Sequence, residues 1–306
     1  MNTPLYILSL PRSGSTLLQK VLALHPEIET ASEPWILLPL LYALRRSGAV
    51  AEYSHGNAVR GIEDFLGDIG GTDRYLADIG ALVRSMYEDK ACSRSAYFLD
   101  KTPRYYLIAD DIAKMYPDAK FLVLFRNPLA VVSSMANTWQ GGRWQLRNWL
   151  DDLTKGPRCL VSFAENHPSH CFCVNYEHFV ANPESSLKQI MYFLNLNMDS
   201  IQMDTFSSVN LKGAMGDPTG QTKYNNISKT SMNQWKNAFQ SPLRRLWARR
   251  YLAHLGDPML ETMGYNADII GSDLPASISM KQVLFDCIDM PYSTLIHRVK
   301  MYVFSR

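Results

Sequence analysis

Hydrophobic residues along this chain of 306 residues fall into short continuous runs that alternate with longer stretches of helical spacing. The short runs are typical of strands buried on both faces, because each is apolar and is bounded by charged residues or turn residues. They predict four strands, over Leu5–Leu10, Ala96–Asp100, Lys120–Phe125 and Cys171–Tyr176. Strands that alternate with helices predict an α/β fold, with a central, mostly parallel sheet flanked by helices.

The stretches between these runs carry apolar residues at helical spacing. They predict helices over Gly14–Leu24, Arg104–Tyr116, Pro128–Trp139 and Pro183–Leu194. Asn127 is placed to cap the third of these helices, and Pro128 suits its first turn. Because ligands of such sheets bind beyond the carboxyl ends of the strands, we expect the functional site at that edge.

Three segments depart from the regular alternation. Residues 35–95 are mostly helical in pattern and lie between the first two predicted strands, so we interpret them as a helical insertion over the carboxyl edge of the sheet. Residues 213–236 are rich in glycine and predict a long loop, of the kind that is usually functional or disordered. We interpret 1–306 as a single domain whose residues 271–306 form a variable C-terminal tail, with a helical pattern around Val283–Ile288.

Composition narrows the class of protein. The formal net charge is +2, which gives no general reason to expect binding to nucleic acid or to a membrane. The longest apolar stretch, Trp35–Leu44, is interrupted by Pro39 and is far shorter than the ~20 residues that span a bilayer. Because no basic region followed by an apolar stretch precedes the first strand, we expect a cytoplasmic protein.

The turn after the first predicted strand has the layout of a phosphate-binding loop, with the sequence Pro11-Arg12-Ser13-Gly14-Ser15-Thr16. Backbone N–H groups in such a turn, and the helix N-terminus behind it, face an anion. The loop nearly matches the nucleotide-binding pattern G-x-x-x-x-G-K-[ST], but Ser9 replaces the first Gly and Ser15 replaces the Lys. Without that Lys the loop is a poor holder of a β,γ-phosphate with magnesium, although it can hold one terminal phosphate-like group, with Arg12 supplying the charge.

Three further motifs follow the loop. They are Leu24-His25-Pro26 leading to Ser32-Glu33-Pro34, Asp100-Lys101-Thr102-Pro103, and Phe125-Arg126-Asn127-Pro128 followed by Ser133-Ser134. In this order, over roughly residues 4–240, the motifs resemble the sulfotransferases that use 3′-phosphoadenosine 5′-phosphosulfate (PAPS), especially the tyrosylprotein, glycan and bacterial small-molecule branches. The resemblance implies a P-loop sulfotransferase-like fold. It also implies an enzyme that moves a sulfuryl group from PAPS to a hydroxyl or amine of a small metabolite or glycan, without a metal, and releases 3′,5′-adenosine bisphosphate (PAP).

The resemblance assigns the donor site to two separate segments. The loop, with Arg12, Ser13, Gly14, Ser15 and Thr16, is expected to bind the 5′-phosphosulfate. Arg126 is expected to grip the 3′-phosphate bidentately, and Ser134, about two helical turns further on, to meet the same group. Each has a simpler interpretation: Arg12 as a solvated turn residue, Arg126 as the partner of a carboxylate, and Ser134 as a residue on a helix surface. Further candidate phosphate contacts lie in the later loop, at Lys223, Ser228 and Lys229.

The candidate catalytic residues are Glu33, Lys101 and Arg12. The resemblance implies that Glu33 takes the proton of the acceptor, and Trp35 with the flanking prolines could desolvate its carboxylate. Lys101 follows a predicted strand and is the candidate cation for the leaving group. The cytosolic branch of the family has a catalytic His near the position of Lys101 and a Lys in the phosphate loop, where this chain has Lys101 and Arg12 instead. Which of these two residues contributes more to stabilising the transition state is therefore left open. A surface or capping role for Glu33, and a salt bridge from Lys101 to Asp100 or a neighbour, are the simpler interpretations.

The remaining observations concern the acceptor and the alternatives. Trp139, Trp144 and Trp149 recur at a spacing of five, which is no helical stripe, and we expect them in the core. We expect the helical insertion and the tail to shape the acceptor pocket. No Cys or His spacing indicates a metal site. The alternative enzyme is a P-loop nucleotide or metabolite kinase, and the alternative without catalysis is a protein that binds adenosine bisphosphate as a sensor or scaffold.

Overall fold

The computed structural model describes residues 2–92, 95–201 and 229–290, together with Phe206, Val209 and Leu211. Within them, five strands form one sheet in the order β2-β3-β1-β4-β5. The strands are β1 (Thr3–Ser9), β2 (Ile28–Thr30), β3 (Tyr97–Asp100), β4 (Lys120–Phe125) and β5 (Cys171–Asn175). All four pairings are parallel, which confirms the predicted α/β fold.

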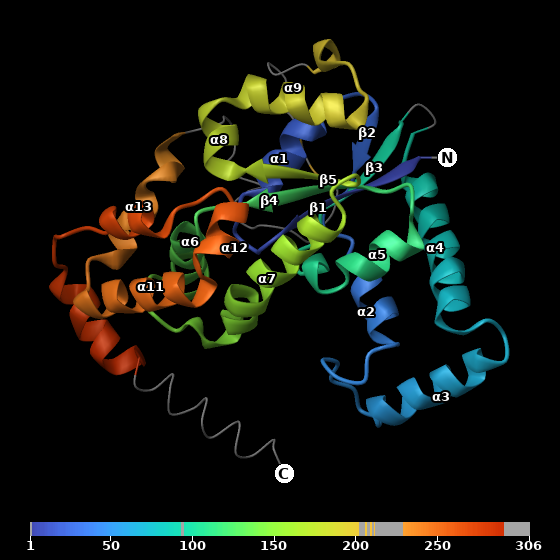
Figure 1. Cartoon of the computed structure of the whole chain (residues 1–306), viewed down its shortest axis with the longest axis horizontal. Coiled ribbons are helices and arrows are strands. Elements are labelled where there is room, and N and C mark those ends of the chain that lie inside the picture. Colours follow the sequence, from blue (N-terminus) through green and yellow to red (C-terminus); the bar gives the residue numbers. More distant parts are fainter. Residues whose placement is uncertain are drawn as a thin grey trace.

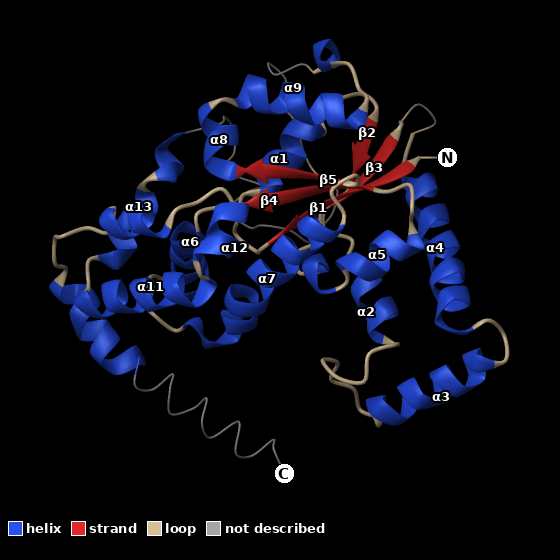
Figure 2. Ribbon diagram, in the orientation of Figure 1, coloured by secondary structure: helices blue, strands red, loops and turns tan. Residues whose placement is uncertain are grey.

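Helices cover both faces of this sheet (Figures 1 and 2). One face carries α1 (Ser15–Leu22), α8 (Tyr176–Ala181) and α9 (Pro183–Leu194). The other face carries α2 (Leu37–Tyr42), α4 (Gly71–Lys90), α5 (Ala109–Met115), α6 (Pro128–Gln140) and α7 (Leu150–Asn166). The remaining helices are α3 (His55–Gly67), α11 (Pro242–Leu255), α12 (Asp257–Thr262), α13 (Ala267–Ser272) and a helix over residues 280–290. Short 3-10 helices are η1 (Tyr105–Leu107), η2 (Leu146–Trp149), η3 (Met198–Ser200), η5 (Lys229–Met232) and η6 (Gln234–Phe239).

The strands are apolar throughout because each of their two faces enters a separate core. In β1, Tyr6 and Leu8 pack under the α4–α7 layer, whereas Leu5 and Ile7 pack under α1 and α9. This double burial is the arrangement that produces continuous apolar runs in parallel sheets. The four predicted strands are confirmed within two residues at each end.

The short strand β2 is absent from the strands predicted above. This strand has only three residues, and of these only Ile28 is fully buried. Its stability comes from pairing with β3, in the register Ile28 with Tyr97 and Thr30 with Leu99. Local sequence contains no signal for so short a strand, because periodicity needs at least four residues to be visible.

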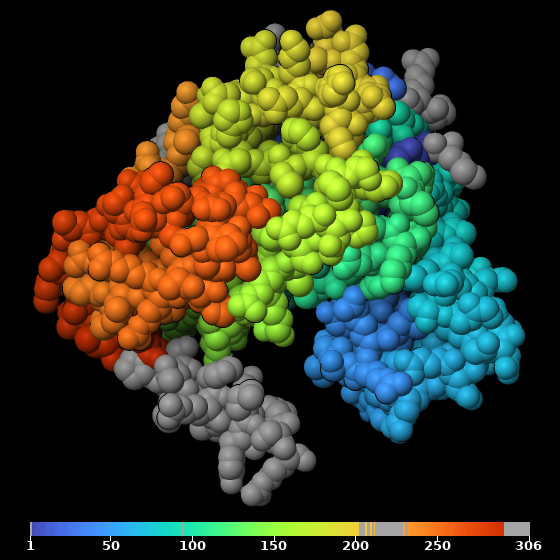
Figure 3. Space-filling model, in the orientation of Figure 1, coloured from blue at the N-terminus to red at the C-terminus, as the bar shows by residue number. Residues whose placement is uncertain are grey.

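The helical insertion follows β2, and it extends well beyond the carboxyl edge of the sheet. It starts at that edge, where the Trp35 amide donates to Thr102 Oγ1 at 3.3 Å. It returns along α4 to the opposite edge, where Arg84 Nη1 donates to the Asn2 carbonyl at 3.4 Å. In Figure 3 the blue and cyan residues of α2, α3 and α4 form a lobe beside the body of the molecule.

The order of the strands creates a crevice at their carboxyl ends. The chain leaves β1 for α1 on one face, and it leaves the neighbouring β4 for α6 on the other face. Where adjacent connections diverge in this way, an open space forms beyond the strands, and ligands of α/β proteins bind there. None of the described helices combines the length and the hydrophobicity that a bilayer crossing requires.

Candidate active site

Every strand delivers a polar or aromatic residue to the same edge of the sheet. The loop of Arg12 follows β1, Glu33 follows β2, Lys101 follows β3, Arg126 follows β4, and Tyr176 follows β5. A cavity of about 260 Å³ opens there. Its lining residues are Pro11, Arg12, Gly14, Ser15, Thr16, Glu33, Trp35, Lys101, Pro103, Arg104, Trp139 and Trp149.

The loop after β1 is shaped by Gly14. Its φ of 89° lies in the left-handed region, and a Cβ atom there would lie 2.2 Å from Cε2 of Tyr176. Only glycine avoids both problems, so the loop can approach the ring after β5 closely. The helix α1 starts directly behind it, with Ser15 and Thr16 buried at its first turn.

Arg126 holds this loop from the side of β4. Its Nη1 donates to the Arg12 carbonyl at 2.9 Å, across 114 residues of sequence. Its guanidinium carbon lies 4.4 Å from the centre of the Tyr176 ring, a cation–π contact. The side chain is buried, and within the described part of the chain its Nε has no hydrogen-bond partner. A buried cation with an unused donor is suited to an anionic ligand.

Arg12 and Ser134, which the resemblance assigns to different phosphate groups of the donor, are neighbours in space. Arg12 Nε donates to Ser134 Oγ on α6 at 3.2 Å. The φ of Arg12 is 69°, which lies in the left-handed region. The neighbouring Ser133 is buried, and its Oγ lies 3.5 Å from Asn137 Nδ2.

Glu33 and Lys101 form a buried ion pair in the lining of the cavity. Lys101 Nζ lies 2.6 Å from Glu33 Oε1, and the two side chains are 3% and 9% exposed. The same Nζ lies 3.4 Å from Thr16 Oγ1, so Lys101 connects the carboxylate to the phosphate loop. Trp35 Nε1 donates to the second oxygen, Glu33 Oε2, at 3.1 Å. Among the described residues each carboxylate oxygen has one of these donors, which leaves each an acceptor site, because a carboxylate accepts about four hydrogen bonds in all.

The position of Glu33 is fixed by α1 and β3. Gln19 of α1 is fully buried, and its Nε2 donates to Thr30 Oγ1 and to the Ala31 carbonyl, each at 2.8 Å. Thr30 Oγ1 in turn donates to the Leu99 carbonyl at 2.7 Å. These bonds hold the chain beyond β2 against β3, and they place Glu33 beside Lys101.

Backbone strain is concentrated around the cavity. Among the described residues, four other than glycine have a positive φ, and three of them line the cavity: Arg12, Trp35 and Arg104. Such conformations cost of order 1–3 kcal/mol each and cluster at functional sites. Arg104 is held by two bonds to the buried Asp152, at 3.0 and 2.9 Å.

Asp100, directly before Lys101, is completely buried. It accepts hydrogen bonds from Tyr87 at 2.7 Å, from Thr102 at 2.7 Å and from Tyr105 at 3.2 Å. Burial raises the pKa of Asp100 from 3.8 to about 6, against the opposing effects of these hydroxyl groups and of the Lys101 charge. Lys101 forms its salt bridge with Glu33, whereas Asp100 is bound by the three hydroxyl groups. The salt bridge considered for Lys101 is therefore present, with Glu33 as its partner and not Asp100.

This raised pKa predicts a pH dependence of stability. Between about pH 4 and pH 6 the folded protein holds a proton on Asp100 that the unfolded chain releases, so the free energy of unfolding falls as pH rises. The rise from 3.8 to about 6 corresponds to roughly 3 kcal/mol. We expect the stability difference between the wild type and Asp100→Asn, measured by urea unfolding, to shrink by about this amount from pH ~4 to pH ~7. A constant difference would contradict the buried, protonatable carboxyl.

The remaining predicted residues have mixed outcomes. Lys229 is an exposed residue at the start of η5, which contacts α8, and Lys223 and Ser228 lie outside the described residues.

Trp144 is in the core, as expected. The expectation was wrong for Trp139, which is 38% exposed, lines the cavity and stacks on Trp149. The turn between α6 and η2 brings these two rings together, and sequence spacing gives no signal of this.

Comparison with known proteins agrees with the arrangement of the motifs. A family model described as the sulfotransferase family matches residues 4–200, which is more than half of the chain. The chain belongs to the sulfotransferase family. Nodulation protein NoeE of Sinorhizobium fredii is 27% identical over 91% of this chain. Protein-tyrosine sulfotransferase 2 of Gallus gallus is 26% identical over 87% of it.

Solved structures show the fold of this sulfotransferase. A sulfotransferase domain from the curacin biosynthetic pathway aligns with a TM-score of 0.56 at 19% identity, covering 87% of this chain and 99% of that domain. The sulfotransferase domain of the Synechococcus PCC 7002 olefin synthase aligns with a TM-score of 0.55 at 22% identity, covering 87% and 96%. The chain spans about two thirds of the length of the curated relatives named above, 66% of NoeE and 67% of the chicken protein.

Proposed function

We propose that this sulfotransferase transfers the sulfuryl group of PAPS to a hydroxyl or amine of a small metabolite or glycan, without a metal. The observation that carries the proposal is the position of Arg126. It is a buried guanidinium with an unused Nε, and it supports the loop of Arg12 from a second strand. PAPS carries anionic groups at both its 5′ and its 3′ positions, and the crevice offers a cationic group for each.

In this proposal, residues on the two sides of the crevice bind different ends of the donor. The amides and hydroxyl groups of Ser13, Ser15 and Thr16, together with the α1 N-terminus, hold the 5′-phosphosulfate. Arg126 and Ser134 hold the 3′-phosphate, and Arg12 lies between the two groups because its backbone is in the loop and its side chain reaches Ser134. The left-handed Gly14 allows the loop to approach this nucleotide without a side chain in the way.

Transfer requires one bond to form and one to break. The acceptor oxygen or nitrogen bonds to sulfur, while the bond from sulfur to the bridging oxygen of the 5′-phosphate breaks and leaves PAP. Glu33 takes the proton from the acceptor through a free acceptor site on its carboxylate. Lys101 stabilises the negative charge that develops on the leaving phosphate, because its Nζ lies between Glu33 and Thr16 at the phosphate loop.

Ligand-induced stabilisation tests the donor. We expect PAP to raise the melting temperature in the presence of EDTA, because binding to the folded state adds RT ln(1 + [L]/Kd) to its stability. At a concentration 100 times the dissociation constant this amounts to about 2.7 kcal/mol. We expect ATP with magnesium to have little effect, because Ser15 replaces the lysine of nucleotide-binding loops.

The reverse ranking, with strong stabilisation by ATP and magnesium and none by PAP, would favour a kinase. Stabilisation by PAP without transfer from PAPS to any compound in a pooled acceptor screen would favour the sensor or scaffold.

A further inference from the structure

Two stacked tryptophan rings belong to the lining of the cavity that contains Glu33. Trp139 lies in the last turn of α6 and Trp149 ends η2, and their ring centres lie 5.0 Å apart at an interplanar angle of 22°. Both residues line the cavity that contains Glu33 and Lys101. Their indole surfaces are suited to the apolar face of a ring, and they play no part in holding the donor described above.

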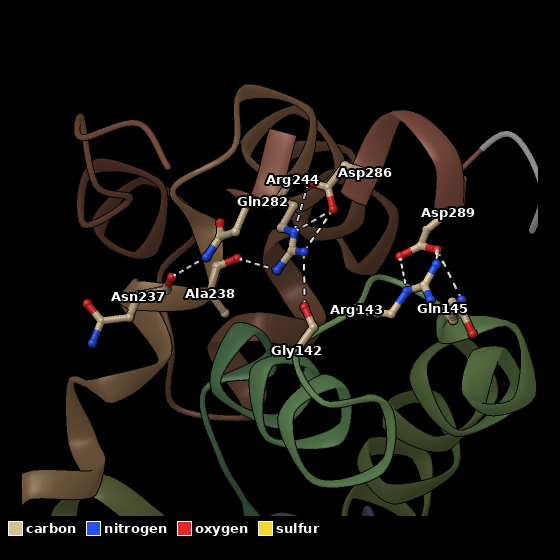
Figure 4. A network of polar contacts seen from close by, with 9 residues as sticks. All are labelled: Gly142, Arg143, Gln145, Asn237, Ala238, Arg244, Gln282, Asp286 and Asp289. Atoms are coloured by element: carbon tan, nitrogen blue, oxygen red, sulfur yellow. Dashed lines mark hydrogen bonds and ion pairs between the residues drawn. The ribbon is translucent and has the colours of Figure 1, made fainter. Parts of the chain in front are cut away.

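The turn that joins these two tryptophans is bound to the helix over residues 280–290. Arg143 contacts Asp289 through two atoms, Nε to Oδ2 at 3.1 Å and Nη2 to Oδ1 at 2.5 Å. Gln145 Nε2 also donates to Asp289 Oδ1, at 3.0 Å. Figure 4 shows these side chains converging on Asp289 from the turn below it.

A buried ion pair between Arg244 of α11 and Asp286 also holds this turn. Arg244 Nε lies 2.9 Å from both carboxylate oxygens of Asp286, and its Nη2 donates to the Gly142 carbonyl at 3.0 Å. The Arg244 guanidinium also lies 4.7 Å from the centre of the Trp144 ring. Figure 4 shows Arg244 joining Asp286 of this helix to the backbone of the turn at Gly142, and the same guanidinium also contacts the ring of Trp144.

These contacts determine orientation more than stability. Arg244 and Asp286 are at most 1% exposed, and a buried ion pair contributes little net stability compared with apolar packing of the same volume. It does impose a directional geometry, because a guanidinium fork binds a carboxylate in one plane. At Asp289, burial opposes ionisation, but the hydrogen bonds from Arg143 and Gln145 outweigh it and lower its pKa.

We infer that the helix over residues 280–290 positions the acceptor site, with Asp289 and Asp286 as positioning residues. They hold the turn of residues 141–148, and this turn sets Trp139 and Trp149 as the surface on which the acceptor's ring stacks. The inference rests on the proposed function. The acceptor class is a compound whose reactive hydroxyl or amine is carried by a ring with an apolar face, and both phenols and pyranosides present such a face.

Two substitutions test this inference from opposite sides of the ion pair. Asp289→Asn removes the buried charge, and Arg143→Gln removes its partner, whose side chain is 45% exposed and tolerates change. For both variants we expect the KM of a phenol or methyl pyranoside acceptor to rise about tenfold, the effect of losing one aromatic stacking contact. We expect kcat and the Kd of PAP to stay within about twofold. Trp139→Ala gives the reference value for complete loss of the stack.

Asp273→Asn is the matched control. Asp273 pairs with Lys236 at 3.1 Å, close in sequence to the 280–290 helix, without contact to the turn. We expect this variant to retain the wild-type KM. An unchanged acceptor KM in both Asp289→Asn and Arg143→Gln, or an equal loss of PAP affinity, would overturn the inference. The responses to phenols and to pyranosides show which ring the surface accepts.

A spectroscopic measurement separates this inference from the proposed function. Stacked indoles give an exciton couplet in far-ultraviolet circular dichroism, and the difference spectrum of Trp139→Phe isolates the contribution of this pair. We expect Asp289→Asn and Arg143→Gln to reduce that contribution, and Asp273→Asn to leave it unchanged. This couplet needs no turnover. If the couplet is unaltered in Asp289→Asn and Arg143→Gln, the positioning role is refuted even when the wild type is an active sulfotransferase. If the couplet is altered in these variants but the wild type shows no sulfuryl transfer, only the proposed function is refuted.

Discussion

Replacing Glu33 with glutamine is expected to lower turnover by about 10²- to 10⁴-fold, the usual contribution of a general base. Glutamine keeps the shape and the hydrogen bond from Trp35, but it cannot accept the acceptor's proton. PAP affinity should stay within about twofold, because Glu33 lies on the acceptor side of the loop. Turnover with PAPS and PAP binding by calorimetry provide the two measurements.

The matched control for this variant is Glu29→Gln. Glu29 is on β2, four residues before Glu33, and it does not line the cavity. It should retain full activity. Wild-type turnover in Glu33→Gln would remove Glu33 from the mechanism.

The buried pair provides a further check on the same variant. Removing one partner of a buried ion pair costs about 3–5 kcal/mol, because the other charge stays buried and unpaired. Glu33→Gln should therefore lower the free energy of unfolding, and the double variant with Lys101→Met should recover part of the loss. The double variant still lacks the base, so it should not recover turnover. Turnover below that of Glu33→Gln alone would show that Lys101 also stabilises the leaving group, whereas equal turnover would limit Lys101 to its structural role.

Replacing Arg126 with alanine is expected to weaken PAP far more than adenosine 5′-phosphate, which lacks the 3′ group. A hydrogen bond to a charged group contributes about 1.5–3 kcal/mol, so loss of a bidentate grip corresponds to a decrease in PAP affinity of about 10²-fold or more. Adenosine 5′-phosphate should lose less than about tenfold, through the lost support of the Arg12 carbonyl. Titration calorimetry with both nucleotides gives this comparison.

Lys120→Ala is the matched control for Arg126→Ala. Lys120 starts the strand that Arg126 follows, and it also lies over an aromatic ring, Phe193, at 5.0 Å. The substitution removes the same charge from the opposite edge of the sheet, so we expect no more than a small change for either nucleotide. Equal losses for PAP and adenosine 5′-phosphate in Arg126→Ala would contradict its 3′-phosphate role.

The parts of the site that could be predicted were local in sequence. The loop after β1 and the capped start of α6 are read directly from neighbouring residues, and the structure confirms both, with Asn127 Oδ1 accepting from the Leu129 amide at 2.9 Å. The contact between Arg12 and Ser134 was not predicted, because the resemblance assigns them to different phosphate groups and Ser134 lies within α6. The roles of these residues in binding and transfer remain predictions.

The acceptor side of the site could not be predicted in the same way. The stack of Trp139 on Trp149 depends on a turn held by Asp289, which is about 140 residues further along the chain. The expectation that the tail shapes the acceptor pocket stays a prediction; the described part of the tail contacts the turn between the two tryptophans through Asp289. The insertion contributes only Trp35 to the described lining.

Local periodicity and turn chemistry were enough to predict the alternation of strands and helices, the phosphate loop and the charged residues that follow β1, β3 and β4. The tertiary structure decided the order of the strands, the existence of β2 and the pairing of Glu33 with Lys101 across 68 residues. The physical reason is that a three-residue strand and a buried ion pair have no stability of their own. Both exist only because distant segments pack around them, and no local pattern encodes which segments these are.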